Sequence, residues 1–221
     1  MLNPEIVGYQ AAQQADAAEI IRLLATVFSQ SEPPAVAVGL SFREMEQFLG
    51  LFAPGAVALG LTIIARDRER GTLAGVLLTD DFAAPPAVDP NQVSPKFQPI
   101  FSMLETLDEQ FRQGKTISSG EYLHLFMLGV APEFAGRGIA QGLVAACLDR
   151  GLRAGYRAAV TEATGKISQR VFRKQEFTDR FSVSYRNFRY EGREVFSSIQ
   201  DHEAAILMEK SLVASAVPPE V

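Results

Sequence analysis

The sequence has few of the residues that build disulfide frameworks and structural metal centres. It contains one cysteine, Cys147, and two histidines in 221 residues. A single cysteine cannot form an internal disulfide, so Cys147 is most simply a small core residue in a reduced compartment. The histidines and the cysteine are not spaced as ligands, so we expect no protein-bound zinc or other metal.

Long apolar runs and an excess of positive charge are also missing. No stretch approaches the roughly 20 apolar residues that span a bilayer, and residues 1–10 lack the charged-then-apolar pattern of a leader. A net charge of −5 disfavours nucleic acid and anionic membranes as partners and suits a cationic substrate. We therefore expect a cytoplasmic protein that acts on a small molecule.

Length and hydrophobic periodicity predict one α/β domain over residues 1–212, with a disordered tail at 213–221. Predicted helices run from Asp16 to Pro33, Ser41 to Pro54, Phe97 to Gly114, Leu143 to Leu152 and Ile167 to Lys174. Predicted strands are Ile6–Gln10, Val57–Arg66, Thr72–Thr79, Leu123–Val130, Arg157–Glu162, Phe181–Tyr190, Val195–Ser198 and Ala204–Leu212. This order gives a mixed sheet with helices on both faces.

Capping residues mark the ends of the first two helices. Asp16 with Glu19, and Ser41 with Glu44, have the spacing of capping boxes. The pair Pro54-Gly55 is expected to stop the second helix.

Turn residues separate several of the predicted strands. Charged residues at Asp67–Gly71 predict a hairpin turn, and Glu191-Gly192 predicts another. Five prolines in residues 80–99 predict a long surface loop that could cover a pocket.

A buried strand, a glycine-bearing turn and a helix follow one another between Leu123 and Leu152. The turn reads Ala135, Gly136, Arg137, Gly138, Ile139, Ala140. This order aims unpaired backbone N–H groups and the positive end of the helix dipole at one point, where a phosphate can be held. The turn is therefore a candidate pyrophosphate cradle.

Spacing distinguishes among the known phosphate cradles. A dinucleotide fingerprint starting at Gly136 needs a third glycine where Gln141 stands, and Gly142 is one residue too late. No G-x-x-x-x-G-K-[ST] sequence occurs, so the P-loop is excluded. By itself, the turn could also be an ordinary strand-to-helix connection that uses glycine for tight geometry.

The turn does match [R/Q]-x-x-G-x-[G/A], and here the sequence resembles the GNAT family of acetyl-CoA-dependent N-acetyltransferases. The resemblance implies the GNAT fold, with a mostly antiparallel twisted sheet, and a coenzyme pyrophosphate bound at 135–140. Ala135 departs from the family, which usually has Arg or Gln there. Softer matches at Thr161–Phe172, Tyr185–Phe188 and Met208–Lys210 look most like the insect arylalkylamine (dopamine-type) acetyltransferases.

Acetyl transfer needs a donor for the developing oxyanion. The backbone at Leu128, Gly129 and Val130 is the candidate, because a glycine near the strand end permits a bulge or a close approach of the ligand. In GNAT enzymes the strand splays here to admit the acyl-pantetheine arm. Gly129 could equally be a packing glycine.

The reaction also needs a base to take the proton of the ammonium group. Glu32, in Ser31-Glu32-Pro33-Pro34, resembles the catalytic glutamate after the first helix of the insect-type enzymes, and desolvation could raise its pKa toward neutrality. A solvated loop glutamate is the alternative. Glu121 and His124 are rivals expected on opposite sides of the sheet, although a histidine in an apolar strand is more often a hydrogen-bonded core residue.

An acid for the leaving thiolate completes the scheme. Many GNAT enzymes use a tyrosine where this chain has Phe172, which cannot donate a proton. The insect-type enzymes have two hydroxyl residues four apart, and Thr164 and Ser168 show this spacing. Either residue could instead cap a helix.

The leading hypothesis is thus direct acetyl transfer from acetyl-CoA to a small primary amine, perhaps an arylalkylamine, without an acyl-enzyme at Cys147. One alternative is a CoA-binding sensor or silent interaction module on the same fold. Another is a peptide or protein N-terminal acetyltransferase. The oligomeric state is open, and a homodimer is possible.

Overall fold

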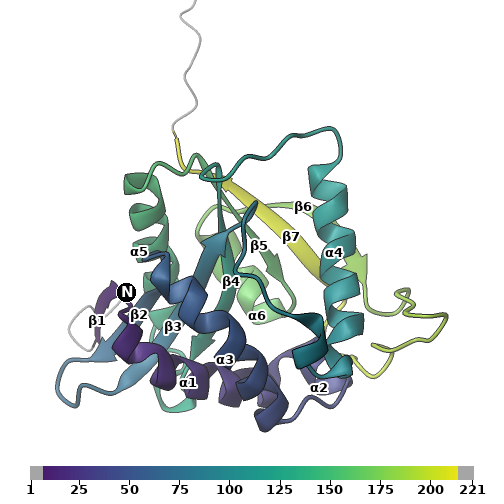
Figure 1. The fold of residues 1–221 in the computed structure, drawn as a ribbon, viewed down its shortest axis with the longest axis horizontal. Helices are drawn as coiled ribbons and strands as arrows, with labels where there is room; N and C mark the ends of the chain where they lie inside the picture. The colour runs from purple at the N-terminus through teal and green to yellow at the C-terminus, as the bar shows by residue number, and fades with distance from the viewer. Residues whose placement is uncertain (1–6, 214–221) are drawn as a thin grey trace, which may run out of the picture.

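Seven strands form one mixed sheet through the middle of the protein (Figure 1). The computed structural model describes residues 7–213, so the predicted tail lies outside the described residues from residue 214 onward. The strand order is β1-β2-β3-β4-β5-β7-β6, and only the neighbours β4 and β5 are parallel. The strands are β1 Val7–Ala11, β2 Ile63–Asp67, β3 Leu73–Asp81, β4 Tyr122–Val130, β5 Ala158–Ala163, β6 Thr178–Ser184 and β7 Ala204–Ser211. The predicted mixed, mostly antiparallel sheet is confirmed.

Helices cover both faces of this sheet, as predicted. One face carries α1 (Ala17–Ser31), α2 (Pro33–Ala37), α3 (Phe42–Ala58) and α4 (Gln98–Arg112), and the other carries α5 (Ile139–Arg153) and α6 (Lys166–Lys174). Short 3-10 turns are η1 Gln14–Asp16, η2 Pro90–Gln92, η3 Pro95–Phe97 and η4 Pro132–Phe134. Successive strand side chains point to opposite faces, so Val76 and Leu78 enter one apolar core and Leu77 the other.

Asp16 is the N-cap of α1, as predicted, but it forms no capping box with Glu19, whereas the second predicted box is confirmed. Asp16 ends η1, where its carboxylate accepts the Gln13 N–H at 2.7 Å and pairs with Arg66 at 2.6 Å. An ion pair with a residue 50 positions away therefore replaces the expected local box with Glu19. Ser41 and Glu44 form the reciprocal box that the spacing predicts.

Pro54 does not stop α3, which continues to Ala58. Proline inside a helix costs about 3 kcal/mol, but Ala53 before the proline and Ala56 and Val57 on the turn after it are all buried. Their burial favours the continued helix, and β2 consequently starts at Ile63 rather than at Val57.

The segment after β6 contains the predicted turn at Glu191-Gly192, but it does not contain the strand predicted at 195–198. Glu191 and Gly192 have φ of 48° and 77°, in a turn closed by a bridge between Tyr190 and Arg193. Residues 195–198 form turns instead of a strand. Phe196 is fully buried and stacks on Phe188, with 5.4 Å between the ring centroids. This one buried ring holds the segment in place without the alternating burial of a strand.

The middle of the sheet opens into a fork. β4 and β5 pair from Tyr122 to His124, and then they separate. The Thr161 hydroxyl donates to the Leu125 carbonyl at 2.8 Å across the start of the opening. On the other edge of β4, Phe126 is an extra residue between the partners of Leu78 and Thr79, which makes a β-bulge.

Two glycines let α5 pack closely on the sheet beside this fork. A Cβ atom on Gly142 would lie 2.1 Å from the Tyr9 hydroxyl oxygen of β1. A Cβ on Gly151 would lie 2.6 Å from a methyl group of Leu123 on β4. Gly142, which the dinucleotide pattern could not use, is therefore needed for helix packing.

Candidate active site

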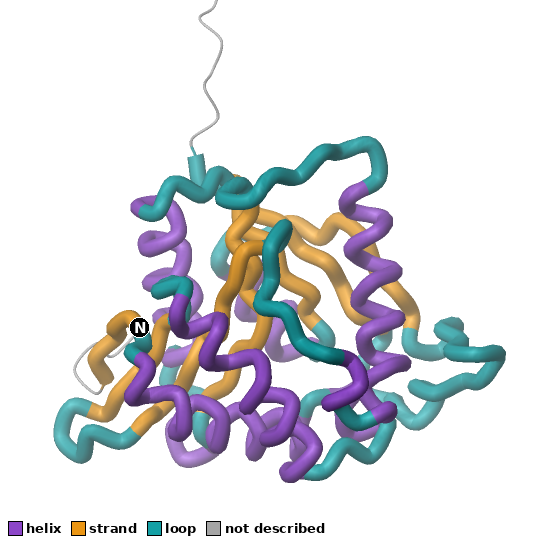
Figure 2. Tube along the Cα trace, viewed as in Figure 1, coloured by secondary structure: helices purple, strands orange, loops and turns teal. Residues whose placement is uncertain are grey.

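The fork opens into a large pocket of about 1260 Å³. Its wall combines both fork strands, the turn before α5, the start of α6, the end of α1, and aromatic residues of α3 and α4. The loop between β3 and α4 crosses the front of the sheet (Figure 2), and Phe97 at its end lines the pocket. The proline-rich loop predicted to cover a pocket thus contributes to its wall.

All six residues of the predicted cradle, Ala135 to Ala140, line this pocket. Gly136 and Gly138 have φ of 74° and 79°, the left-handed region that glycine enters without strain. Gly138 is the N-cap of α5. Its carbonyl is the first acceptor of the helix, and the N–H of Gly142 donates to it. The N–H groups of residues 139–141 therefore have no acceptor within the helix, and such free N–H groups at a helix N-terminus bind anions well.

Of the three oxyanion candidates, Leu128 and Val130 have backbone N–H groups that face the pocket, and Gly129 packs against a helix. The Ala131 N–H donates to Ala74 of β3 at 2.9 Å, and N–H groups alternate between the two edges of a strand. The N–H groups of Leu128 and Val130 therefore point away from β3, toward the gap left by β5, and both residues line the pocket.

Gly129 lies between them and packs against α1. A Cβ there would lie 2.8 Å from a methyl group of Leu24 and 3.1 Å from one of Leu23. The β-bulge of β4 lies at Phe126 rather than at Gly129. Gly129 thus has the packing role that the sequence left open, and a role of its backbone toward the coenzyme stays a prediction.

Glu32 lies on the pocket wall between α1 and α2. Its carboxylate accepts the Ala35 N–H at 2.6 Å and so caps α2, which starts at the two prolines. Burial raises the pKa of Glu32 to about 7, although hydrogen bonds with the Thr164 side chain and the Ala35 amide oppose the rise. The predicted shift toward neutrality is confirmed, and a carboxylate with this pKa can accept a proton at neutral pH.

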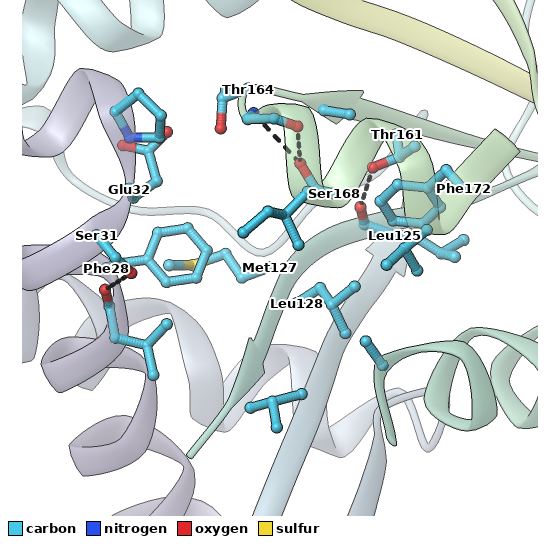
Figure 3. Close-up of a pocket in the computed structure, with 18 of the residues that line it drawn as sticks. Phe28, Ser31, Glu32, Leu125, Met127, Leu128, Thr161, Thr164, Ser168 and Phe172 are labelled. Carbon is cyan, nitrogen blue, oxygen red and sulfur yellow. Dashed lines mark hydrogen bonds between the residues drawn. The ribbon is translucent and has the colours of Figure 1, made fainter. Parts of the chain in front are cut away.

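Thr164, which follows β5, lies beside Glu32, and Ser168 lies in the first turn of α6 (Figure 3). The Ser168 hydroxyl donates to the Gly165 carbonyl at 2.9 Å and accepts the Gly165 N–H at 3.3 Å, so it does cap α6. The Thr164 carbonyl accepts the Tyr185 hydroxyl at 2.6 Å. Both hydroxyls border the pocket, and a role in the reaction stays a prediction.

Comparison with known proteins identifies the fold. The model of the acetyltransferase (GNAT) family matches residues 60–177, more than half of the chain. The chain belongs to the GNAT family. No curated protein sequence matches it significantly.

Several solved structures share this GNAT fold. The chain is 17% identical to the C-terminal condensation domain of Ebony in complex with beta-alanyl-dopamine, with a TM-score of 0.86 over 96% of this chain and all of that one. It is 22% identical to arylalkylamine N-acetyltransferase 2 from Aedes aegypti, with a TM-score of 0.79 over 94% and 99%. It is 16% identical to the Drosophila melanogaster polyamine N-acetyltransferase that forms N-acetylagmatine, with a TM-score of 0.70 over 93% and 99%. At these identities the likeness shows the fold alone.

GNAT enzymes use acetyl-CoA, and the pocket has cationic residues that sequence reasoning missed. Arg170 and Lys174 are four apart on α6 and line the pocket. Their i, i+4 spacing on the helix after the fork was the available signal. His202 also lines the pocket and accepts the Lys166 N–H on Nδ1 at 3.1 Å.

The rival bases and the cysteine lie outside the lining residues of this GNAT pocket. Glu121 precedes β4, and its carboxylate accepts the Ser118 N–H at 3.1 Å. His124 is buried, as expected for a core histidine, and both ring nitrogens are hydrogen-bonded. Burial also raises the pKa of the Cys147 thiol to about 12, so it is not a nucleophile at neutral pH.

The described part of the chain contains neither a helix suited to a membrane nor a side-chain cluster suited to a metal ion. Between residues 7 and 213, no helix is both long and apolar enough to cross a membrane. The same residues contain no group of three or more His, Cys, Asp or Glu side chains arranged to hold a metal ion.

Proposed function

We propose that this GNAT acetyltransferase transfers the acetyl group of acetyl-CoA directly to a small primary amine. The observation that carries the proposal is a single pocket that joins the anion-binding turn before α5 to a carboxylate whose pKa is about 7. The turn suits the coenzyme pyrophosphate, and Glu32 suits the base. Arg170 and Lys174 add positive charge to the same pocket.

In the proposed reaction, Glu32 takes a proton from the ammonium group, and the free amine attacks the thioester carbonyl carbon. The N–H groups of Leu128 and Val130 stabilise the negative charge that develops on the carbonyl oxygen. When the carbon–sulfur bond breaks, the electron pair leaves with the thiolate, which takes a proton from Ser168 or Thr164. That hydroxyl recovers a proton from the nitrogen, which loses its second proton as it becomes the amide. The buried thiol of Cys147 supports direct transfer without an acyl-enzyme.

Aromatic residues support an acceptor with an apolar body. Phe48, Phe97, Phe101 and Phe126 all line the pocket, and Phe48 lies 4.8 Å from Phe97 and 6.4 Å from Phe126 between ring centroids. Such a wall favours an aryl group or a cation held over ring faces. An arylalkylamine is therefore one candidate for the acceptor.

The test is thiol release from acetyl-CoA with phenethylamines, alkyl amines, polyamines and short peptides as acceptors. Release with one or more small amines, together with the N-acetylated product by mass spectrometry, is the expected result. Acetyl-CoA binding without release for any acceptor would favour the sensor alternative. Release with peptides alone would identify an N-terminal acetyltransferase instead.

A further inference from the structure

Four titratable side chains form a buried cluster next to the pocket. His124 of β4 lies between Asp80 of β3 and Glu162 of β5, with Nδ1 2.9 Å from Asp80 Oδ1 and Nε2 2.8 Å from Glu162 Oε2. The side chains of Asp80, His124 and Glu162 are 0%, 11% and 4% exposed. Asp108 of α4 is within hydrogen-bonding range of Glu162.

This cluster has more carboxyl groups than cationic groups. Burial lowers the pKa of His124, but the charges of Asp80 and Glu162 outweigh it and raise that pKa well above its usual value. One imidazolium therefore faces three carboxyl groups. No lysine or arginine of the described chain forms a salt bridge with them. Arg112 lies nearby, but its guanidinium donates to the Phe82 carbonyl at 2.6 Å.

Three buried oxygen atoms of the cluster have no donor within residues 7–213, namely Asp80 Oδ2, Asp108 Oδ1 and Glu162 Oε1. Burial and then the charge of Glu162 raise the pKa of Asp108 to about 8, so a proton shared between Asp108 and Glu162 can satisfy the oxygens of these two residues. A cationic donor would satisfy the same two oxygens and would also offset the charge of the Glu162 carboxylate.

Glu162 is the member of the cluster that reaches the pocket. It lines the wall together with Leu104 of α4 and Phe126 of β4. Asp108 lies one helical turn after Leu104 on α4, and His124 lies two residues before Phe126 on β4. Each therefore shares a face of its element with a residue of the pocket wall and lies next to this part of the wall.

The spacing along β5 separates Glu162 from the reacting centre. Glu162 is two residues before Thr164, which follows β5 and hydrogen-bonds to Glu32. Both residues line the pocket, and at most about 7 Å of chain separates them. An acceptor whose amine reaches Glu32 can therefore place its other end near Glu162.

We propose that Glu162, supported by His124 and Asp108, binds a second positively charged group of the acceptor. The preferred acceptor is then a primary amine with an ammonium, guanidinium or imidazolium group at its far end, joined by an apolar spacer that lies against the aromatic wall. This inference rests on the proposed function, because it concerns the acceptor side of the same pocket. It differs from a simple arylalkylamine preference, which needs no buried carboxylate.

The test compares two acceptors of equal carbon number, pentylamine and cadaverine, with wild-type protein and Glu162→Gln. We expect the wild type to use cadaverine with at least about tenfold higher kcat/KM. Glu162→Gln should lower kcat/KM for cadaverine about tenfold to a hundredfold, the range for a hydrogen bond to a charged group, while pentylamine changes less than about threefold. Most of the loss should be in KM.

Glu209→Gln is the matched control, because Glu209 of β7 is a largely buried carboxylate that bonds to Tyr122 and Arg180 outside the pocket lining. It should leave the cadaverine preference unchanged. If Glu162→Gln does not fold, Asp108→Asn is the second variant, because it leaves the bonds of His124 to Asp80 and Glu162 in place. It should still reduce the preference for cadaverine over pentylamine severalfold.

Two outcomes would overturn the proposal: equal use of both acceptors by the wild type, or an equal loss for both acceptors in the foldable variant. Absence of transfer to any amine would instead contradict the proposed function.

Discussion

Replacement of Glu32 by glutamine tests the base most directly. The pKa of Glu32 is about 7, against about 4.5 for an ordinary glutamate. With that pKa the carboxylate fraction is about a tenth at pH 6 and about nine-tenths at pH 8, so kcat/KM for the amine should rise about tenfold over this interval. A base with an unshifted pKa would already be ionised at pH 6 and would give no such rise.

Glu32→Gln should remove that rise and lower kcat about a hundredfold to ten-thousandfold, the usual contribution of general acid–base catalysis. The glutamine oxygen can still accept the Ala35 N–H, so the cap of α2 is kept. The assay measures kcat and kcat/KM for the amine across this pH range, because kcat/KM reports the groups that titrate in the protein before the amine binds.

The free energy of unfolding of Glu32→Gln distinguishes loss of the base from misfolding. The folded-state pKa of Glu32 is raised, so its ionisation disfavours the folded state, and stability falls as pH increases from about 4.5 to about 7. Glutamine does not ionise, and Glu32→Gln should therefore be at least as stable as wild type at pH 8 by urea unfolding.

Glu44→Gln is the matched control for this experiment. Glu44 also serves a helix N-terminus, but hydrogen bonds from Ser41 hold its pKa near 2, and it is not among the pocket-lining residues. This variant should keep the wild-type pH dependence of kcat/KM. The reasoning fails if Glu32→Gln stays within about threefold of wild type and keeps the rise between pH 6 and pH 8.

The cradle and the proposed acid can be tested by matched pairs. Gly136→Ala and Gly71→Ala each place a side chain at positive φ in open space and should each cost about 1 kcal/mol of stability, but only Gly136→Ala should weaken acetyl-CoA binding, about tenfold by calorimetry. Equal affinities in the two variants would contradict a cradle at residues 135–140. Ser168→Ala should lower kcat at least about tenfold, whereas Ser197→Ala, which removes a similar bond to a carbonyl three residues back on the exposed surface, should not. If Ser168→Ala is as active as Ser197→Ala, the serine only caps α6.

Local features of the chain were predictable because short segments determine them. The turn from Ala135 to Ala140 needs left-handed residues and a following helix, and both requirements are visible in adjacent residues. The box between Ser41 and Glu44 and the turn at Glu191-Gly192 are equally local. Sequence reasoning failed where a distant contact outweighed a local signal, as when burial of the next turn carried α3 through Pro54.

Sequence alone thus determined the family resemblance, the mixed sheet with helices on both faces, and the anion-binding turn. Only the tertiary structure decided that Gly129 packs on α1 and that the bulge lies at Phe126. It also brought Asp80, Asp108, His124 and Glu162 together. These four residues come from β3, α4, β4 and β5, and no spacing along the chain relates them. The physical reason is that burial and charge pairing depend on which elements pack together, whereas turns and caps depend on neighbouring residues.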